Sequence, residues 1–266
     1  MIRGVAACLL AIAVIPAAAQ SPVVNAVVER RTASADFARD VQSAAARPMP
    51  AWIGYRVPIT RRADAGLQTA ESSCCGRCRL APPSDLVVLA RVQQGSVLEL
   101  RPLAADCDMD AGGMPLVWFD GVNADASVAW LSTLVANPPA GSPRVAQNAL
   151  LAIGQQAGQT AVSALVKFGQ SGTTQVRSQS LVWLARRAAA EALPAIDLAL
   201  QKDPDTEVKK QAVFALSRFP NQEGIPKLMD VARTHSNPEV RRQAMFWLGQ
   251  SKDPRVVDFF AQILLK

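Results

Sequence analysis

The chain has one histidine, His235, and one tyrosine among its 266 residues. Histidine is the usual base beside a serine or cysteine nucleophile and the commonest metal ligand, so few catalytic or metal sites can be built without it. The patterns GxxxxGK[ST], GxGxxG, GxSxG and HExxH are also missing. We therefore expect no catalysis, no metal site and no cofactor, and we expect His235 to be an exposed loop residue before Asn237 and Pro238.

Long apolar runs are equally scarce. Residues 5–15 form one, but it is too short to span a bilayer. Arg3 precedes this run and Ala17, Ala18 and Ala19 follow it, which is the arrangement of a secretory signal peptide. Residues 1–19 therefore predict export to the periplasm or the cell exterior, and we expect no membrane span.

Acidic residues are in deficit in one half only. Residues 143–266 contain 16 Lys and Arg against 10 Asp and Glu, whereas residues 20–142 contain 11 against 12. The net charges are thus +6 and −1. A long-range attraction for acidic partners would belong to residues 143–266.

The sequence does contain a repeat of about thirty-two residues. The segment EVKKQAVFALSRF at 207–219 returns as EVRRQAMFWLGQS at 239–251, and the same template fits around Val145 and Val176. Each unit is predicted to be two helices joined by a short turn, which bury their apolar faces only by stacking. The residues expected to be buried between units are Phe214, Leu216, Phe246 and Leu248. The inward positions of the second helices are predicted to be Val162 and Leu165, Leu193 and Ile196, Ile225 and Leu228, and Val257 and Phe260.

The repeat has the form DP-x-x-x-V-[KR]-x-x-A-x-x-x-L, followed by I-P-x-L. This pattern resembles short HEAT repeats of the phycobilisome-lyase type over residues 143–266. The resemblance implies a mostly α-helical chain whose repeats form a right-handed α-solenoid of about four helix pairs. Enzymatic relatives in that family include bilin lyases and a di-iron hydroxylase with paired His-Glu motifs. A single histidine excludes the di-iron site here.

Residues 20–142 carry a different pattern. Residues 36–47 place Phe37, Val41 and Ala44 on a narrow apolar face, which favours one helix within a linker at 20–49. Short apolar or alternating stretches separated by turns predict a small β-rich, disulfide-bonded domain at 50–122. A helix at 125–136 and a linker then form a connection, residues 123–142. The predicted strands are 52–59, 86–92, 97–101 and 116–119.

Four cysteines remain after residue 19: Cys74, Cys75, Cys78 and Cys107. An even number in an exported protein indicates disulfides. A bridge between the neighbours Cys74 and Cys75 would be strained, so we expect one of them to pair with Cys107. The alternative is a thiol–disulfide redox centre, because Cys75 and Cys78 form a CxxC motif. A proline pair soon afterwards argues against it, since redox motifs of this kind open a helix.

Residues 106–112 form an acidic loop similar to the start of a calcium site, with Asp106, Asp108 and Asp110 at alternate positions. The glycine comes one position late, and Val117 stands where a bidentate glutamate is needed. We interpret the segment as an acidic turn, and cation binding is left open.

One candidate binding surface follows the repeated valines. Basic residues there form a predicted basic ridge across three units: Arg177, Lys209, Lys210, Arg241 and Arg242. An acidic protein would be attracted to this basic ridge. The alternative is a solvated face, since solenoids need polar outer surfaces. Nucleic acid is disfavoured, because no aromatic residues are interleaved with the basic ones and the chain is predicted to be exported.

The last predicted helix, residues 255–266, offers a second candidate surface. Its inward stripe is predicted to be Val257, Phe260 and Leu264. A second apolar stripe lies about 100° round the helix and consists of Val256, Phe259 and Ile263. Exposed, it would mark self-association or a partner interface. The alternative is that Val256 and Phe259 fold under the preceding unit, or that the N-terminal domain covers them.

These observations predict an exported protein–protein interaction scaffold that binds through its repeats. The alternative is a periplasmic redox protein or sensor that uses Cys75 and Cys78.

Overall fold

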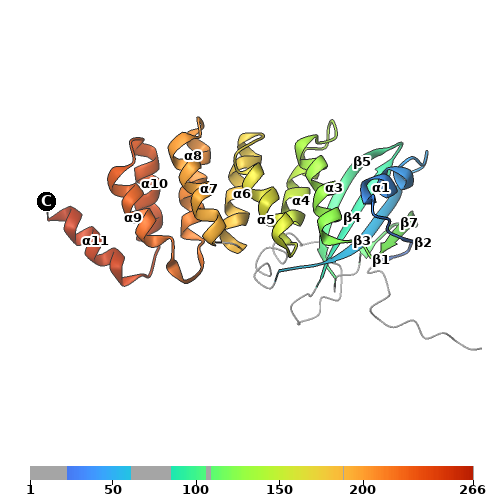
Figure 1. The fold of residues 1–266 in the computed structure, drawn as a ribbon, viewed down its shortest axis with the longest axis horizontal. Helices are drawn as coiled ribbons and strands as arrows, with labels where there is room; N and C mark the ends of the chain where they lie inside the picture. The colour runs from blue at the N-terminus through green and yellow to red at the C-terminus, as the bar shows by residue number, and fades with distance from the viewer. Residues whose placement is uncertain (1–22, 61–84, 106–108, 188, 266) are drawn as a thin grey trace, which may run out of the picture.

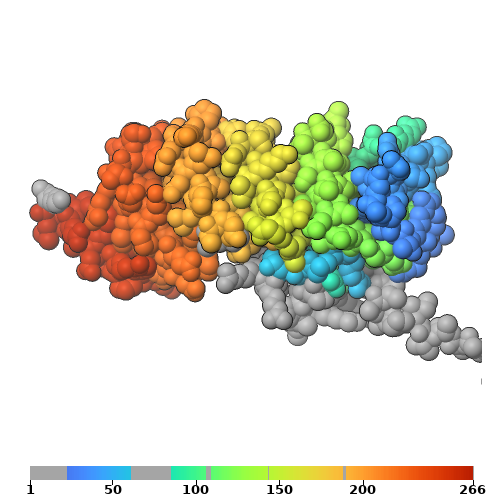
Figure 2. Space-filling view, viewed as in Figure 1, coloured from blue at the N-terminus to red at the C-terminus, as the bar shows by residue number. Residues whose placement is uncertain are grey.

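The computed structural model describes residues 23–60, 85–105, 109–187 and 189–265. A β-sheet lies at one end of the molecule, and helices follow one another along the long axis in chain order (Figure 1). The space-filling view shows the same progression from blue to red (Figure 2). The predicted signal peptide, residues 1–19, lies outside the described residues.

Five strands form the main sheet: β2 (Val27–Thr32), β3 (Ala51–Pro58), β4 (Asp85–Gln93), β5 (Ser96–Ala104) and β7 (Pro115–Asp120). Their order is β2-β7-β3-β4-β5, with β3, β4 and β5 antiparallel in succession. Strand β7 runs parallel to both of its neighbours. A small parallel pair joins β1 (Val23–Val24) to β6 (Met109–Asp110). The four strands expected from the sequence are therefore present.

Strand β2 lies within the segment predicted to be a linker, so that prediction was wrong for residues 27–32. Its side chains do not alternate between buried and exposed, and Val27 is 75% exposed. The strand is held by its pairing with β7 and by Arg30, whose guanidinium lies 2.5 Å from the Asp120 carboxylate. A strand stabilised by pairing rather than burial leaves no period-two pattern in the sequence.

Two helices cover one face of the sheet: α1 (Phe37–Ala45) and α3 (Ala124–Ala136). Asp36 caps α1 and Asn123 caps α3, each through a side-chain oxygen that accepts a backbone N–H. The ring of Phe37 meets Tyr55 edge to face at 5.0 Å between centroids, and Trp130 of α3 approaches both rings. Both helices were expected from the sequence.

Four helix pairs follow α3. They are α4 (Pro143–Gln155) with α5 (Gln159–Phe168), α6 (Thr174–Arg187) with α7 (Ala189–Lys202), α8 (Thr206–Ser217) with α9 (Ile225–Thr234), and α10 (Pro238–Gly249) with α11 (Pro254–Leu264). We call α4, α6, α8 and α10 the first helices and their partners the second helices. First helices pack on first helices and second on second, which is the stacking that the repeat predicts.

The repeated valines lie in the core, as the helical period requires. Val208 and Val240 are fully buried, and Leu216 and Leu248 are buried about two turns further along the same side of their helices. Phe246, however, is 54% exposed and Phe214 is half-buried, so the prediction that both are core residues was wrong. They stand two residues before the buried leucines, which turns them onto a different side of a helix with 3.6 residues per turn.

The last helix is rotated relative to the prediction. Val256 and Phe259 are 4% and 2% exposed, whereas Val257 is 71% and Leu264 83% exposed. The predicted stripes are therefore exchanged, and the alternative that Val256 and Phe259 fold under the preceding unit is the one observed. Val256 lies sixteen residues after Val240, and the equivalent residues of α5 and α7, Ala161 and Ala192, are also buried. Burial of this position is thus common to these second helices, whereas Val257 lies on a side of α11 that no other described helix covers.

Polar bonds link the N-termini of successive first helices. The Thr174 hydroxyl donates to the Asp205 carboxylate at 2.6 Å, and the Asn237 amide donates to the Thr206 hydroxyl at 3.1 Å. Asp205 and Asn237 also cap their own helices by accepting a backbone N–H. The Thr174 bond and the backbone N–H of Glu207 hold the pKa of Asp205 below its ordinary value. These contacts fix the position of each first helix, along its own axis, relative to the next first helix.

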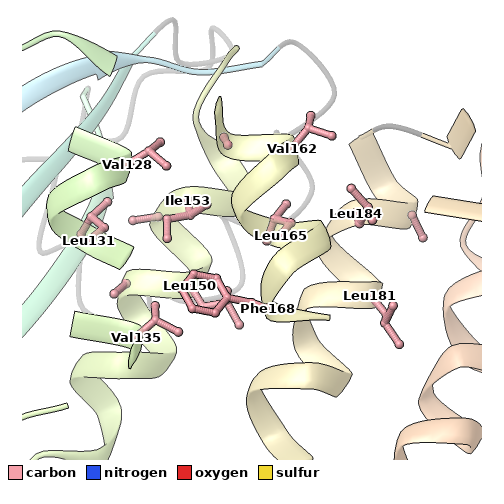
Figure 3. Packing of buried hydrophobic residues seen from close by; sticks show 14 of the residues in the cluster. Val128, Leu131, Val135, Leu150, Ile153, Val162, Leu165, Phe168, Leu181 and Leu184 are labelled. Atoms are coloured by element: carbon pink, nitrogen blue, oxygen red, sulfur yellow. The ribbon is translucent and has the colours of Figure 1, made fainter. Parts of the chain in front are cut away.

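The sheet and the helical array share one hydrophobic core, which runs from Phe37 to Phe259. Helix α4 lies along the edge strand β5, where the Asn148 amide donates to the Leu100 carbonyl at 2.7 Å. Leu131 and Val135 of α3 point toward Leu150 of α4 and the helix α5 beside it (Figure 3). Covering the strand edge protects its carbonyl groups, and it also places the sheet where a preceding repeat would stand.

Candidate protein-interaction face

The outer sides of the first helices carry matching residues at the repeat interval; we call this surface the first-helix face. Three residues after the repeated valines stands an amide row: Asn148, Gln179, Gln211 and Gln243. Six residues after them stands an apolar row: Leu151, Val182, Phe214 and Phe246. All eight side chains are half-buried or exposed, so both rows reach the surface.

A groove of about 560 Å³ crosses α4, α6 and α8 on this face. Gln179, Gln211 and Phe214 line it, together with members of the same rows on α4. A second cavity of about 320 Å³ lies between α8 and α10 and is lined by Arg218 and Trp247. Because Arg218 stacks on Phe214, the two depressions adjoin and extend over all four first helices.

Two arginines at the repeat interval, Arg186 and Arg218, form what we call the arginine pair. The guanidinium of Arg186 lies 5.2 Å from the centre of the Trp183 ring, and that of Arg218 lies 5.0 Å from the Phe214 ring. Burial lowers the pKa of Arg186, and the nearby charge of Arg218 lowers it further. Within the described part of the chain, neither guanidinium has an ion-pair partner.

Aromatic packing between helices holds this face in shape. The Trp183 ring lies so close to Gly154 of α4 that a methyl group there would be 2.7 Å from the ring. The Trp247 ring lies 4.9 Å from Phe214 of α8 and 5.1 Å from Phe246. Each tryptophan thus bridges to the preceding first helix, so the rings stand in a fixed arrangement.

The predicted basic ridge is not a continuous basic surface. Arg177 forms an ion pair with Asp203 at 2.8 Å, with side chains 15% and 7% exposed, and it also donates to the Gly172 carbonyl. Arg241 donates to the carbonyls of His235 and Ser236. These two arginines bind the loop before their own helix. Their role is to hold neighbouring repeats together, which spacing alone does not distinguish from binding.

The remaining ridge residues are divided. Lys210 lies 2.5 Å from the Glu207 carboxylate, one turn away on α8. Arg242 is exposed and Lys209 is half-buried, and neither has an ion pair within the described ranges.

Of the candidate residues of α11, Val256 and Phe259 are core residues and are not accessible to a partner. The arginine pair was missed, although its spacing of thirty-two residues is visible in the sequence.

The cysteines and part of the acidic loop lie outside the residues that the structure describes. Cys74, Cys75, Cys78 and Cys107 lie outside the described residues, so their disulfides and the CxxC motif stay predictions. In the acidic loop, Asp110 accepts bonds from the Asn25 amide at 2.8 Å and the Gly112 N–H at 2.7 Å. These bonds lower the pKa of Asp110, with the Gly112 bond the larger cause.

His235 has a structural position. Its Nδ1 accepts the Asn237 N–H at 3.1 Å, which leaves Nε2 to donate to the Leu200 carbonyl at 3.0 Å. The residue therefore ties the α9–α10 loop to the end of α7. It is a loop residue as expected, but it is half-buried rather than exposed. Across residues 23–60, 85–105, 109–187 and 189–265, no cluster of three or more His, Cys, Asp or Glu side chains is arranged to hold a metal ion.

In the described part of the chain, no helix combines the length and the apolar character needed to cross a bilayer.

Comparison with known proteins finds a similarity for the repeats. Residues 194–266 match the family model of HEAT repeats, which covers α8 to α11 and most of α7. No curated protein matches the chain. HEAT repeats generally serve as scaffolds for protein interactions, and typically carry no catalytic site. The C-terminal part of this helical array is thus similar to HEAT repeats.

Proposed function

We propose that this protein is an exported scaffold, without catalysis, that binds a protein partner on its first-helix face. The observation that carries the proposal is the alignment of two rows of accessible side chains along four stacked helices, with a groove of about 560 Å³ between them. Surfaces that only need to be soluble carry charged residues, whereas the two rows on this face present amides and apolar side chains. Phe246 is a large apolar residue left 54% exposed, which suits a partner contact.

Site-specific crosslinking tests the proposal. A photoreactive amino acid is placed at Gln211 or Phe246 on the first-helix face, and at Ser163 or Asp230 on the second helices as matched exposed controls. In cells that produce the protein, we expect one partner to crosslink from the first pair and not from the second. The reverse pattern, or equal yields from both faces, would contradict the proposal.

Affinity measurements then follow with the purified partner. The variant Gln211→Ala, Gln243→Ala, Phe246→Ser removes no charge and no buried core side chain. It should weaken binding at least tenfold, because central contacts dominate interface energies. Its melting temperature should stay near that of the unaltered protein, so that a loss of binding is not a loss of fold.

Export is part of the proposal and rests on the signal-peptide pattern of residues 1–19. Cell fractionation should find the chain outside the cytoplasm and shortened at its N-terminus. A count of free thiols in that material separates the scaffold from the redox alternative. Structural disulfides leave no free thiol and resist mild reductant, whereas a redox pair at Cys75 and Cys78 is readily reduced.

Self-association through α11 is a separate proposal. It is favoured by the exposure of Val257, Leu264 and Leu265, at 71%, 83% and 87%. Sedimentation of Val257→Ser with Leu264→Ser should show a smaller species than the unaltered chain with the same melting behaviour. If the unaltered chain sediments as a monomer at high concentration, this proposal is wrong.

A further inference from the structure

We propose that the first-helix face binds an extended acidic peptide segment in the polyproline II conformation, with its carboxylates on the arginine pair. The inference rests on the proposed function and names the chemistry of the partner. Its three supports are the charge of Arg186 and Arg218, the amide row beside them and the spacing of the helices.

The arginine pair supplies the charge selection. Arg186 and Arg218 are close enough for each to feel the charge of the other, and within the described residues no carboxylate compensates either. Each guanidinium is stacked on a ring, which fixes its plane and leaves its N–H groups at the edge for an acceptor. Guanidinium groups bind carboxylates through two parallel hydrogen bonds. Glu207 also lines the groove, but Lys210 neutralises it.

The amide row supplies contacts for a peptide backbone. An amide side chain both donates and accepts hydrogen bonds, as does each peptide group of an extended chain. Gln179, Gln211 and Gln243 present such groups once per helix, and no described side chain or backbone group bonds to their amides. The apolar row beside them offers Phe214 and Phe246 as surfaces for proline rings.

The spacing selects the conformation. Packed helices lie roughly 8–10 Å apart, so equivalent side chains on neighbouring first helices recur at about that distance. A β-strand presents the same face every two residues, or roughly 6.6 Å, and falls out of phase with the rows. A polyproline II helix repeats every three residues, or roughly 9.3 Å, and stays in phase. Every third residue of the peptide would then lie against the next first helix along the face.

Fluorescence anisotropy with synthetic peptides tests the inference on the full chain. The probe contains four Glu-Pro-Pro units, and the controls are four Lys-Pro-Pro units, four Glu-Gly-Ser units and a fifteen-nucleotide oligothymidine. We expect the Glu-Pro-Pro probe to bind tightest, with an affinity that falls as salt is added. Equal binding of the flexible Glu-Gly-Ser peptide would overturn the conformational part, and preferred binding of oligothymidine would assign the face to nucleic acid.

Two variants with the same loss of charge locate the site. Arg186→Gln with Arg218→Gln should weaken binding of the Glu-Pro-Pro probe at least tenfold. Lys209→Gln with Arg242→Gln removes two charges from the predicted basic ridge. This variant should change the affinity for the Glu-Pro-Pro probe less than twofold. Equal effects of the two variants would show non-specific attraction and overturn the inference. Arg218→Gln alone, at an exposed position, gives the same comparison if the Arg186 change disturbs packing on Trp183.

The natural partner separates failure of the inference from failure of the proposed function. If the variant Gln211→Ala, Gln243→Ala, Phe246→Ser loses the partner while the double arginine variant keeps it, the face binds a protein but not through an acidic segment. In that case this inference fails and the proposed function stands. If neither variant affects the partner, both fail.

Discussion

Individual residues on one helix differ sharply in what they contribute. Leu216 is buried at the junction of α8 with its neighbours, whereas Phe246, two positions before the equivalent leucine of the next repeat, is mostly exposed. Size and hydrophobicity alone would rank the phenylalanine as the more important core residue. Its direction on the helix makes it a surface residue.

This contrast gives a stability prediction. Leu216→Ala should lower the free energy of unfolding by about 2–5 kcal/mol, since it removes buried atoms and leaves a cavity. Phe246→Ala should cost less than about 1 kcal/mol, because its ring is already in water over half its surface. Urea denaturation followed by circular dichroism measures both. A larger cost for Phe246→Ala would mean that the repeats are packed in another register.

Tyr55 is the one tyrosine of the chain and is fully buried, with its hydroxyl 2.8 Å from that of Ser127. Burial raises the pKa of Tyr55 well above its ordinary value. Above about pH 10 the unfolded state loses the phenol proton while the folded state keeps it. The unfolded state then binds fewer protons, so this residue makes stability fall as pH rises.

The predicted decline is about 1.4 kcal/mol per pH unit above pH 10 from Tyr55 alone. Tyr55→Phe with Ser127→Ala removes both members of the hydrogen bond, and the slope of its unfolding free energy should be shallower by that amount. Phenolate absorbance is a second reading, since Tyr55 is the sole source of it. Titration of that absorbance near pH 10 in the folded protein would contradict the prediction.

At the scale of elements, the repeats depend on close approach between one helix end and the next helix start. Gly224 precedes α9, and a methyl group there would lie 2.0 Å from the backbone oxygen of Leu216. A backbone atom inside a helix cannot move aside as a side chain can. The α8–α9 turn thus requires glycine for space rather than for an unusual dihedral angle.

Gly224→Ala should therefore destabilise the chain by about 3 kcal/mol, at the upper end of overpacking effects. Gly249→Ala is the matched control, because it ends α10 and a methyl group there meets nothing within 4 Å. That change should be neutral or stabilise by up to about 1 kcal/mol, since alanine is the better helix former. Thermal denaturation of both variants measures the difference. Similar melting temperatures would contradict the prediction, because they would show that the α8–α9 turn can move to accommodate the methyl group.

At the scale of the whole molecule, the sheet and the repeats are continuous. Helix α3 contacts the sheet on one side and α4 and α5 on the other, and the core has no break between them. Repeat arrays transmit stability mainly between neighbours, so the effect of a core change should fade along the array.

Amide hydrogen exchange measures how far the effect of a core change extends along the array. Leu131→Ala in α3 should speed amide exchange in β3, β4 and α4 and leave α10 nearly unchanged. Leu248→Ala should do the reverse, with faster exchange in α10 and little change in the sheet. A uniform increase throughout the molecule in both variants would mean that it unfolds as a single unit.

The sequence by itself determined the local features. The thirty-two-residue period predicted the helix pairs and the burial of Leu216 and Leu248, because each repeat needs the same apolar contacts. Alternating and unbroken apolar runs likewise predicted β3, β4, β5 and β7. In both cases the pattern follows from burial, on one side of each helix and on both faces of β3 and β4.

Tertiary structure decided what depends on contacts between elements. Packing of α11 on the preceding repeat buried Val256 and left Val257 exposed, and pairing with β7 made a strand of a charged segment. An ion pair with Asp203 withdrew Arg177 from the predicted basic ridge, and hydrogen bonds to loop carbonyls withdrew Arg241, while stacking on aromatic rings aligned Arg186 with Arg218. Periodicity states which residues are equivalent, but partners from neighbouring elements decide whether an equivalent residue is structural or left for a ligand.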